Sequence, residues 1–222
     1  MSSTARWGQR EPTDYYATPQ GAIVTFLDSF LQTQEGNKLL QPYPQEKLLR
    51  TDLKILDPCA GGNLEPKVYE GKRKGKSVMY DTKMAYPTVL ANYWAVNIVT
   101  NDIREDSPAT YHKDFTITSL VPSIWGIYDL VISNPPFAFA EQFILNSLKL
   151  VKEWGIVVML LRLNFFWSQK RKKFWEENMP MYSFVHRERM GFTPDGATDS
   201  IEYMHAVWIK WLNPEFSKLK II

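Results

Sequence analysis

Apolar residues fall into short runs whose spacing alternates between that of buried strands and that of amphipathic helices. The runs predict strands at residues 54–57, 97–101, 128–133 and 156–161. Helical spacing predicts helices at residues 23–31, 86–94, 141–152 and 170–178. Strands that alternate with helices indicate an α/β fold with a mostly parallel sheet. Two further strands, 184–189 and 205–211, have no helix between them and indicate an antiparallel hairpin at one edge.

Two unusual turns each follow a buried strand. The first is Asp57-Pro58-Cys59-Ala60-Gly61-Gly62-Asn63, and the second is Asn134-Pro135-Pro136-Phe137. Glycines directly after a strand indicate a tight turn with close backbone approach to a ligand. The first turn lacks the Lys-Ser/Thr ending of a phosphate-binding P-loop. Because ligands of open α/β sheets lie beyond the carboxyl ends of the strands, the topology places the two turns together.

An acidic residue ends the strand at 97–101. Asp102 stands where an acid typically accepts hydrogen bonds from the ribose hydroxyls of an adenosine-containing cofactor. A role as a cap or turn former is equally compatible with this position. Asp81 follows a shorter apolar stretch at 78–80 and is the alternative acid. The better strand precedes Asp102, so Asp102 is preferred.

The turn that begins at Asn134 carries the most specific chemistry. Its two prolines stiffen the backbone, and their carbonyls have no local N–H competition. The Asn134 amide oxygen is an acceptor, and Phe137 offers a flat face. Acceptors beside an aromatic platform form a site for the exocyclic amine of a planar base. The alternative interpretation is a cis-proline turn with a phenylalanine that belongs to the core.

Composition limits the classes of protein. The chain has 222 residues, 45% of them hydrophobic, with a formal net charge of +2, which are values of a globular protein. The single cysteine, Cys59, excludes an intramolecular disulfide and a cysteine-rich zinc site, so no metal is expected. No apolar run is long enough to span a membrane, and residues 1–12 do not resemble a secretory signal. These features predict a cytoplasmic protein without membrane contact.

Positive charge is concentrated in two segments. Residues 67–83 and 162–189 each carry a balance of +4, and the second segment is interleaved with aromatic residues. Such a pattern suits a surface for phosphates and bases. A solvated helix face is the alternative for residues 170–173. The first segment is predicted to be a mobile loop from Lys67 to Lys76. The expected nucleic-acid contacts are Lys72, Arg73, Lys74, Arg162, Lys170, Arg171, Lys172 and Lys173.

Together these segments resemble the class I S-adenosylmethionine-dependent amino-methyltransferases, and specifically the phage-type DNA adenine-N6 methyltransferases. The resemblance rests on Asp14 to Pro19, the first turn, residues 101–106, the second turn, and residues 160–165 and 192–203, in that order along the chain. It extends from about Tyr15 to Trp211. It implies a Rossmann-like, seven-stranded, mostly parallel sheet with helices on both faces. It also implies a single domain over residues 1–222, with a basic insertion at about 64–83 and no separate large target-recognition domain.

The resemblance also assigns a cofactor and roles to individual residues. It implies S-adenosylmethionine as the cofactor and DNA as the substrate, while a monomer and a homodimer are both compatible with the sequence. The implied cofactor contacts are Tyr16, Thr18, Pro19, Asp57, Pro58, Cys59, Ala60, Gly61, Asp102, Ile103, Asp114, Phe115 and Asn134. The implied catalytic residues are Asn134, Pro135, Pro136 and Phe137.

The same motif leaves the substrate open. Enzymes with an Asn-Pro-Pro-Phe/Tyr turn also methylate adenine in RNA, cytosine at its exocyclic amine, or glutamine in proteins. A second alternative is an inactive nucleic-acid-binding module of the same fold. Cys59 is interpreted as a small packing residue rather than a nucleophile, because it lies within the cofactor turn.

Overall fold

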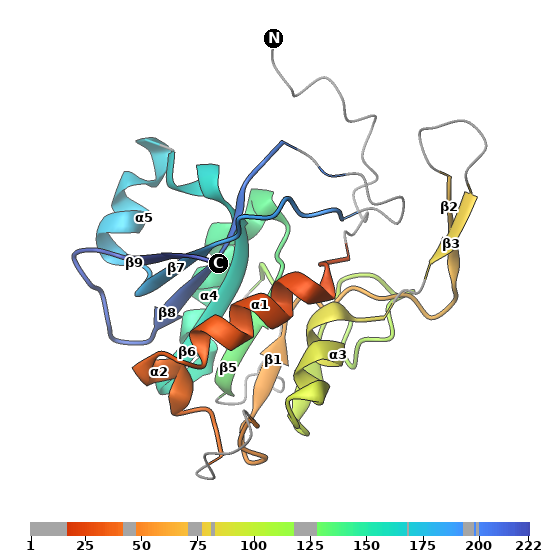
Figure 1. The fold of residues 1–222 in the computed structure, drawn as a ribbon, viewed down its shortest axis with the longest axis horizontal. Helices are drawn as coiled ribbons and strands as arrows, with labels where there is room; N and C mark the ends of the chain where they lie inside the picture. Colours follow the sequence, from red (N-terminus) through yellow and green to blue (C-terminus); the bar gives the residue numbers. More distant parts are fainter. Residues whose placement is uncertain are drawn as a thin grey trace.

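The fold is built on one seven-stranded sheet and a separate two-stranded hairpin (Figure 1). The computed structural model describes residues 17–41, 48–70, 77–80, 83–117, 128–167, 169–192, 198 and 200–222. The strand order in the large sheet is β4-β1-β5-β6-β8-β7-β9. Its strands are β1 (Ile55–Asp57), β4 (Ile98–Thr100), β5 (Tyr128–Ser133), β6 (Val151–Arg162), β7 (Tyr182–Val185), β8 (Tyr203–Ile209) and β9 (Lys218–Ile221).

Strand directions agree with the predicted fold class. β4, β1, β5 and β6 are parallel neighbours, as are β7 and β9. β8 is antiparallel to both β6 and β7. The predicted antiparallel pair of late strands is therefore confirmed as β7 and β8. The edge strand on this side of the sheet is β9, which pairs with β7. Hydrophobic periodicity did not reveal β9, because all four of its residues are exposed.

Helices cover both faces of the sheet. On one face, α1 (Gln20–Phe30) and α3 (Ala85–Asn92) pack through residues such as Phe26 and Leu90 against Ile132 of β5. On the other face, α4 (Ala140–Leu150) and α5 (Lys172–Glu177) pack with Val131 of the same strand. Figure 1 shows α1 crossing in front of the sheet. Both faces of β5 are covered, which explains its continuous apolar sequence. A short helix, α2 (Gln34–Asn37), follows α1.

Several predicted boundaries are wrong. The helix predicted to reach residue 152 ends at Leu150, because β6 already begins at Val151. Tyr128 pairs with Val151 but Leu130 pairs with Ile156, so the extra residues of β6 form an irregularity. Within it, Trp154 has a φ of 61°, in the left-handed region.

The end of the chain shows two further differences. The helix predicted over residues 170–178 consists of a 3₁₀ turn, η5 (Gln169–Arg171), followed by the shorter α5. The strand predicted over residues 184–189 is β7, which ends at Val185. Beyond it, the His186 backbone N–H donates to the Tyr203 carbonyl and Arg187 donates to Ile222. Backbone hydrogen bonds to the chain before β8 and after β9 therefore continue just beyond Val185, where the regular strand ends.

The predicted basic loop is partly a hairpin. β2 (Lys67–Glu70) and β3 (Ser77–Tyr80) pair antiparallel and project away from the main sheet (Figure 1). The prediction of a loop starting at Lys67 is therefore wrong for residues 67–70, where valine and tyrosine favour a strand. Lys72, Arg73, Lys74 and the alternative acid Asp81 lie outside the described residues. Among the residues that the structure does describe, no helix has the length and apolarity to cross a membrane.

Candidate functional site

The two turns meet at the carboxyl edge of the sheet, because β1 and β5 are parallel neighbours. One hydrogen bond joins the two strand ends, since Ser133 Oγ donates to Asp57 Oδ1 at 2.6 Å. The backbone N–H of Cys59 donates to the same oxygen at 3.2 Å. Asp57 is fully buried, and its Oδ2 has no hydrogen-bond partner among the described residues. Burial raises the pKa of Asp57 to about 7, against the opposing effect of its two donors.

The glycine turn follows Asp57 and has the backbone shape that only glycine adopts easily. Gly61 has a φ of 68° and Gly62 a φ of 75°. Pro58 and Ala60 are buried, and the Ala60 N–H donates to the carbonyl of Asn101 beyond β4. The turn is therefore fixed by hydrogen bonds to the neighbouring strand end. At the carboxyl edge of the sheet, the turn therefore presents the backbone of two glycines, with no side chain on either.

Asp102 is bound to this turn. Its Oδ2 accepts the Gly61 N–H at 2.9 Å, and its Oδ1 accepts the backbone N–H and Nε of Arg104 at 3.0 and 3.2 Å. Asp102 is 2% exposed, so its carboxylate is a buried cross-link of the turn. Ile103 lies between these two buried residues and is 60% exposed. The role of Asp102 as a ribose acceptor stays a prediction.

Arg104 is a central residue that the sequence reasoning missed. Its guanidinium is 6% exposed, and its Nη1 donates to Asn63 Oδ1 at 2.8 Å and to Asp106 Oδ1 at 3.0 Å. Its Nη2 donates to the Gly62 carbonyl. One arginine thus connects the end of β4 to the glycine turn. The available signal was the pair of Asp102 and Arg104, spaced two residues apart after a strand. Arginine is usually exposed, however, and no neighbouring residue in the sequence indicated that Arg104 would be buried.

The asparagine turn is joined to the segment before α1. Asn134 Nδ2 donates to Thr18 Oγ1 at 3.0 Å, across 116 residues of sequence. Thr18 is 5% exposed and is followed by Pro19, the N-cap of α1. The Asn134 amide oxygen accepts no hydrogen bond from the described residues. The structure therefore brings together two predicted site residues, while Tyr16 lies outside its described part.

The aromatic side of the turn begins a short 3₁₀ helix, η3 (Phe137–Phe139). All described peptide bonds are trans, so the cis-proline alternative is wrong. Pro135 is buried, and Pro136 is exposed. The Phe137 ring lies 4.6 Å from the Arg162 guanidinium and 5.9 Å from the Tyr203 ring. Arg162, the last residue of β6, is thus at the site rather than on a remote basic surface.

Three other predicted cofactor contacts have mixed surroundings. Asp114 Oδ1 accepts the N–H and Oγ1 of Thr116 at 2.9 and 2.7 Å. Phe115 is buried against Phe143, with ring centroids 4.9 Å apart. Burial, with nearby acids, raises the pKa of the Cys59 thiol, so the thiol stays protonated. This agrees with the interpretation of Cys59 as a packing residue.

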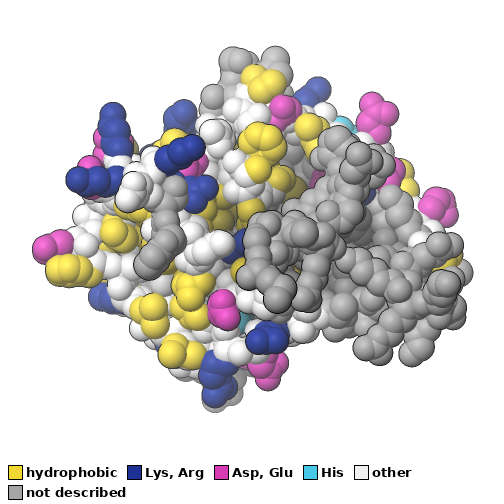
Figure 2. All heavy atoms as spheres, turned by 90° about the horizontal axis from the view of Figure 1, so that it is seen from above, with side chains coloured by type: hydrophobic (Ala, Val, Ile, Leu, Met, Phe, Trp, Pro, Cys, Tyr) yellow, Lys and Arg dark blue, Asp and Glu magenta, His cyan; other side chains and the backbone are white. Residues whose placement is uncertain are grey.

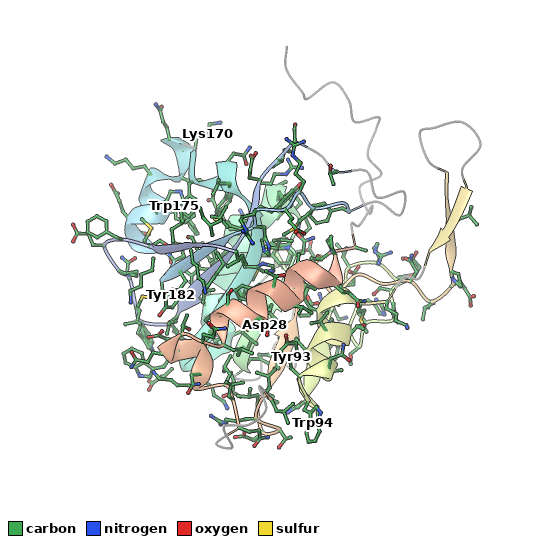
Figure 3. The ribbon with its side chains drawn as sticks, in the orientation of Figure 1. Asp28, Tyr93, Trp94, Lys170, Trp175 and Tyr182 are labelled. Atoms are coloured by element: carbon green, nitrogen blue, oxygen red, sulfur yellow. The ribbon has the colours of Figure 1, made fainter. Side chains whose placement is uncertain are left out.

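The basic segment after β6 divides into two kinds of side chain. Arg171 Nε donates to Glu141 Oε1 at 2.6 Å, and its guanidinium lies 4.1 Å from the Phe165 ring. Lys170, Lys172 and Lys173 are exposed, and the last two are within 3.7 Å of acids one turn away. Figure 2 shows the carboxyl edge from above, with Lys and Arg gathered toward the side where α5 lies. In Figure 3, Lys170 points outward.

Two further features complete the surroundings. An open hollow of about 800 Å³ lies between α5 and the β8–β9 connection, lined by Phe166, Trp175 and Asn213 among others. Of the predicted site residues it includes only Lys172, so it is not the cofactor site. Within the described ranges, no group of three or more His, Cys, Asp or Glu side chains is arranged to hold a metal ion.

Comparisons with known proteins identify the fold. No protein-family model matches the chain, and no curated protein sequence matches it significantly. A candidate class I S-adenosylmethionine-dependent methyltransferase from Listeria monocytogenes matches at 15% identity, over 97% of this chain and 68% of its own, with a TM-score of 0.55. The type IIG restriction endonuclease BpuSI matches at 14% identity, over 93% of this chain and 27% of its own, with a TM-score of 0.56.

The match to a third structure extends over nearly the whole of both chains. A candidate RNA methyltransferase from Pyrococcus horikoshii matches at 11% identity over 94% of each chain, with a TM-score of 0.54. At such identities the likeness concerns the fold. The chain has the Rossmann-like fold of the class I methyltransferases, and the predicted fold class is confirmed.

Proposed function

We propose that this protein transfers a methyl group from S-adenosylmethionine to the exocyclic N6 amine of adenine in DNA. The single observation that carries the proposal is the Asn134 amide at the end of β5. Its nitrogen donates to Thr18, its oxygen accepts from no described residue, and Phe137 follows three residues later in the same turn. This is the arrangement required to hold an amino group on a planar base.

The glycine turn fits the cofactor on three counts. Gly61 and Gly62 adopt left-handed backbone conformations that leave no side chain between the turn and a ligand. The buried Oδ2 of Asp57 can accept a hydrogen bond from a ligand. Ile103 presents an exposed apolar surface next to Asp102, which suits the face of an adenine ring. When bound, S-adenosylmethionine supplies an electrophilic methyl group on a sulfonium.

The residues of this chain act on the amine. Asn134 Oδ1 and the Pro135 carbonyl would accept its two N–H groups, which localises the nitrogen lone pair and stabilises the developing positive charge. The localised lone pair would then be available to the methyl group that the bound cofactor supplies, and the cofactor sulfur would keep the electrons of the C–S bond. The amine then loses a proton to solvent. Positioning provides much of the remaining acceleration, because no strong base is needed before transfer.

The base is held at the aromatic side of the turn. Phe137 would stack on an adenine that has been flipped out of a duplex. In the structure the Arg162 guanidinium lies over the Phe137 ring, so a base can stack on that face only after Arg162 moves. A likeness to a restriction endonuclease supports DNA as the polymer. The nearly complete mutual coverage with a candidate RNA methyltransferase makes adenine in RNA the second candidate.

A methyl-labelling experiment tests the proposal. The protein is incubated with methyl-labelled S-adenosylmethionine and DNA, RNA or protein, and the digested products are identified by mass spectrometry. N6-methyladenine in DNA is the expected product, and label in RNA or protein alone would contradict the DNA assignment. Asn134→Ala should lower kcat by about a hundredfold or more while the cofactor Kd changes little, because the missing acceptor acts in the chemical step.

The matched control is Asn92→Ala, which truncates an exposed asparagine at the end of α3. It should leave both kcat and the cofactor Kd unchanged. If Asn134→Ala transfers methyl groups as fast as the wild type, Asn134 is not the amine acceptor. If it loses cofactor binding and turnover equally, its role is structural.

A further inference from the structure

The guanidinium of Arg162 has no anionic partner in the part of the chain that the structure describes. Arg162 is half-buried, and its Nε is buried without a hydrogen-bond partner. None of the ion pairs among the described residues includes it. The guanidinium lies over the Phe137 ring, 4.6 Å from its centroid, which is a favourable contact but supplies no acceptor. A buried donor without an acceptor costs free energy, so its presence needs an explanation.

A second arginine in the same protein shows the usual arrangement. Arg171 lies over the Phe165 ring at 4.1 Å, as Arg162 lies over Phe137. Its Nε, however, donates to Glu141 Oε1 at 2.6 Å. The contact with a ring is thus combined with a carboxylate at Arg171, whereas no described carboxylate accompanies it at Arg162. The unused donors are therefore particular to Arg162.

The strand order places Arg162 on the substrate side of the candidate site. It ends β6, which lies beside β5 and its Asn134 turn, whereas the glycine turn follows β1 on the other side of β5. Arg162 pairs across the sheet with Tyr203 of β8, whose ring lies 5.9 Å from that of Phe137. The two rings and the guanidinium therefore lie together next to the Asn134 turn. An anion bound by Arg162 would belong to the molecule whose amine meets Asn134, not to the cofactor.

A phosphodiester is the anion that fits this position. A nucleotide whose base stacks on Phe137 carries a phosphate on each side of its sugar, within reach of a long side chain beside that ring. A guanidinium can bind two phosphate oxygens at once through parallel N–H donors. The base needs the ring face that Arg162 covers in the free protein, so the guanidinium leaves as the base arrives. The phosphate then gives the guanidinium the acceptor that the protein does not provide.

We propose that Arg162 binds a phosphate next to the target nucleotide once the base has displaced it from the Phe137 ring. The inference rests on the proposed function, in which Phe137 stacks on the base. It restricts the substrate to a polynucleotide, because a glutamine side chain in a protein brings no such anion. Exchange of one partner for the other couples the stacking of the base to the binding of its backbone.

The test uses a single-stranded oligothymidylate that contains one 2-aminopurine, a fluorescent analogue of adenine that reports stacking. A single strand requires neither base flipping nor a known target sequence. In two further oligonucleotides a neutral methylphosphonate replaces the phosphate on the 5′ side or on the 3′ side of the 2-aminopurine. Fluorescence titrations compare the wild type with Arg162→Met, which keeps the length of the side chain and removes its charge.

One of the two methylphosphonates should weaken binding to the wild type by about tenfold, because a charge-assisted hydrogen bond is lost. The same replacement should change binding to Arg162→Met by less than about twofold, because the guanidinium that meets this phosphate is absent. If the losses from the variant and from the methylphosphonate simply add, the inference is overturned. It is also overturned if Arg162→Met weakens binding while neither methylphosphonate does, since Arg162 would then contact the base.

Arg50→Met is the matched control, because it makes the same change in an arginine that precedes β1 and pairs with the exposed Asp52. It should respond to both methylphosphonates as the wild type does. Arg162→Met should be as stable toward urea as Arg50→Met, because its guanidinium has no anionic partner among the described residues. A markedly lower stability would show a structural role for the guanidinium in the free protein and would count against the inference.

Assays of methyl transfer separate this inference from the proposed function. If the wild type methylates no DNA but Arg162 is coupled to one phosphate, the proposed function fails and the phosphate contact stands. If the wild type methylates DNA and no coupling is found, the phosphate contact fails alone.

Discussion

Removing the guanidinium of Arg104 should strongly destabilise the protein. Arg104→Met keeps the length of the side chain but leaves the Asp102 carboxylate buried without its cation. It also removes the donors to Asn63 Oδ1 and to the Gly62 carbonyl. Removing one partner of a buried pair costs about 3–5 kcal/mol, because the remaining charge is uncompensated. Asp102 keeps two backbone donors, the N–H groups of Gly61 and Arg104. The free energy of unfolding should therefore fall by about 3 kcal/mol, at the lower end of this range.

The control for Arg104 is an ion pair with similar spacing but different burial. Arg50 and Asp52 are two residues apart, as are Asp102 and Arg104. Arg50 donates to both carboxylate oxygens of Asp52, at 3.0 and 2.6 Å. The Arg50 and Asp52 side chains are 41% and 69% exposed, whereas those of Arg104 and Asp102 are 6% and 3% exposed. Solvent screens the exposed pair, so Arg50→Met should leave the stability unchanged within error.

Urea unfolding followed by tryptophan fluorescence measures both variants, with the free energy of unfolding obtained by linear extrapolation. The double variant Asp102→Asn with Arg104→Met should lose less than the sum of the single losses, because removing the charge of Asp102 removes the penalty left by Arg104→Met. A loss for Arg104→Met no larger than that for Arg50→Met would refute the assignment of Arg104 as the buried cross-link of the glycine turn.

Two further predictions concern charge. In the folded state the pKa of Asp57 is about 7, above its usual 3.8, so between these values the folded protein keeps a proton that the unfolded chain releases. The free energy of unfolding should therefore fall between about pH 4 and pH 7, by up to about 4 kcal/mol, and then level off. The buried histidines His186 and His205 have lowered pKa values, so their contribution to the free energy of unfolding rises with pH below pH 6.5. The test is therefore the difference in the free energy of unfolding between the wild type and Asp57→Asn. A difference that is independent of pH would contradict the prediction. Changing Lys170, Lys172 and Lys173 to Gln should weaken DNA binding and flatten the slope of log K against log salt by up to about 0.9 for each phosphate that these lysines neutralise, measured by anisotropy; an unchanged slope would leave them as a solvated helix face.

The parts of the fold that local pattern determines could be predicted. The apolar run at 128–133 predicts the bounds of β5 correctly, because a strand covered on both faces has no polar alternation to blur its ends. The two turns were placed together from the rule that parallel strands share a carboxyl edge, and the hydrogen bond from Ser133 to Asp57 confirms that they meet. The hydrogen bond from Asn134 to Thr18 brings two of the predicted site residues together, and their roles stay predictions.

The parts that depend on distant partners could not be predicted. Arg104 has the sequence surroundings of an ordinary surface charge, and only the folded turn shows that its donors meet Asn63 and Gly62, which lie 41 and 42 residues earlier in the chain. Tyr86 and His205 are 119 residues apart, and each fits its helix or strand without the other. β9 is exposed, so its position depends on backbone pairing with β7 rather than on hydrophobic burial.

The proposed reaction needs the cofactor turn and the amine acceptor to hold a fixed distance, and the structure achieves this with paired strands. Leu56 of β1 pairs with Val131 of β5, directly before the two strands end in their turns. The bond from Ser133 to Asp57 fastens the strand ends just beneath Asn134. A shift of β1 along β5 by a fraction of a residue would break this bond and displace the glycines relative to the amide oxygen. Since a misplacement of about 1 Å can cost about a hundredfold in rate, the register of these two strands belongs to the catalytic geometry as much as the side chains do.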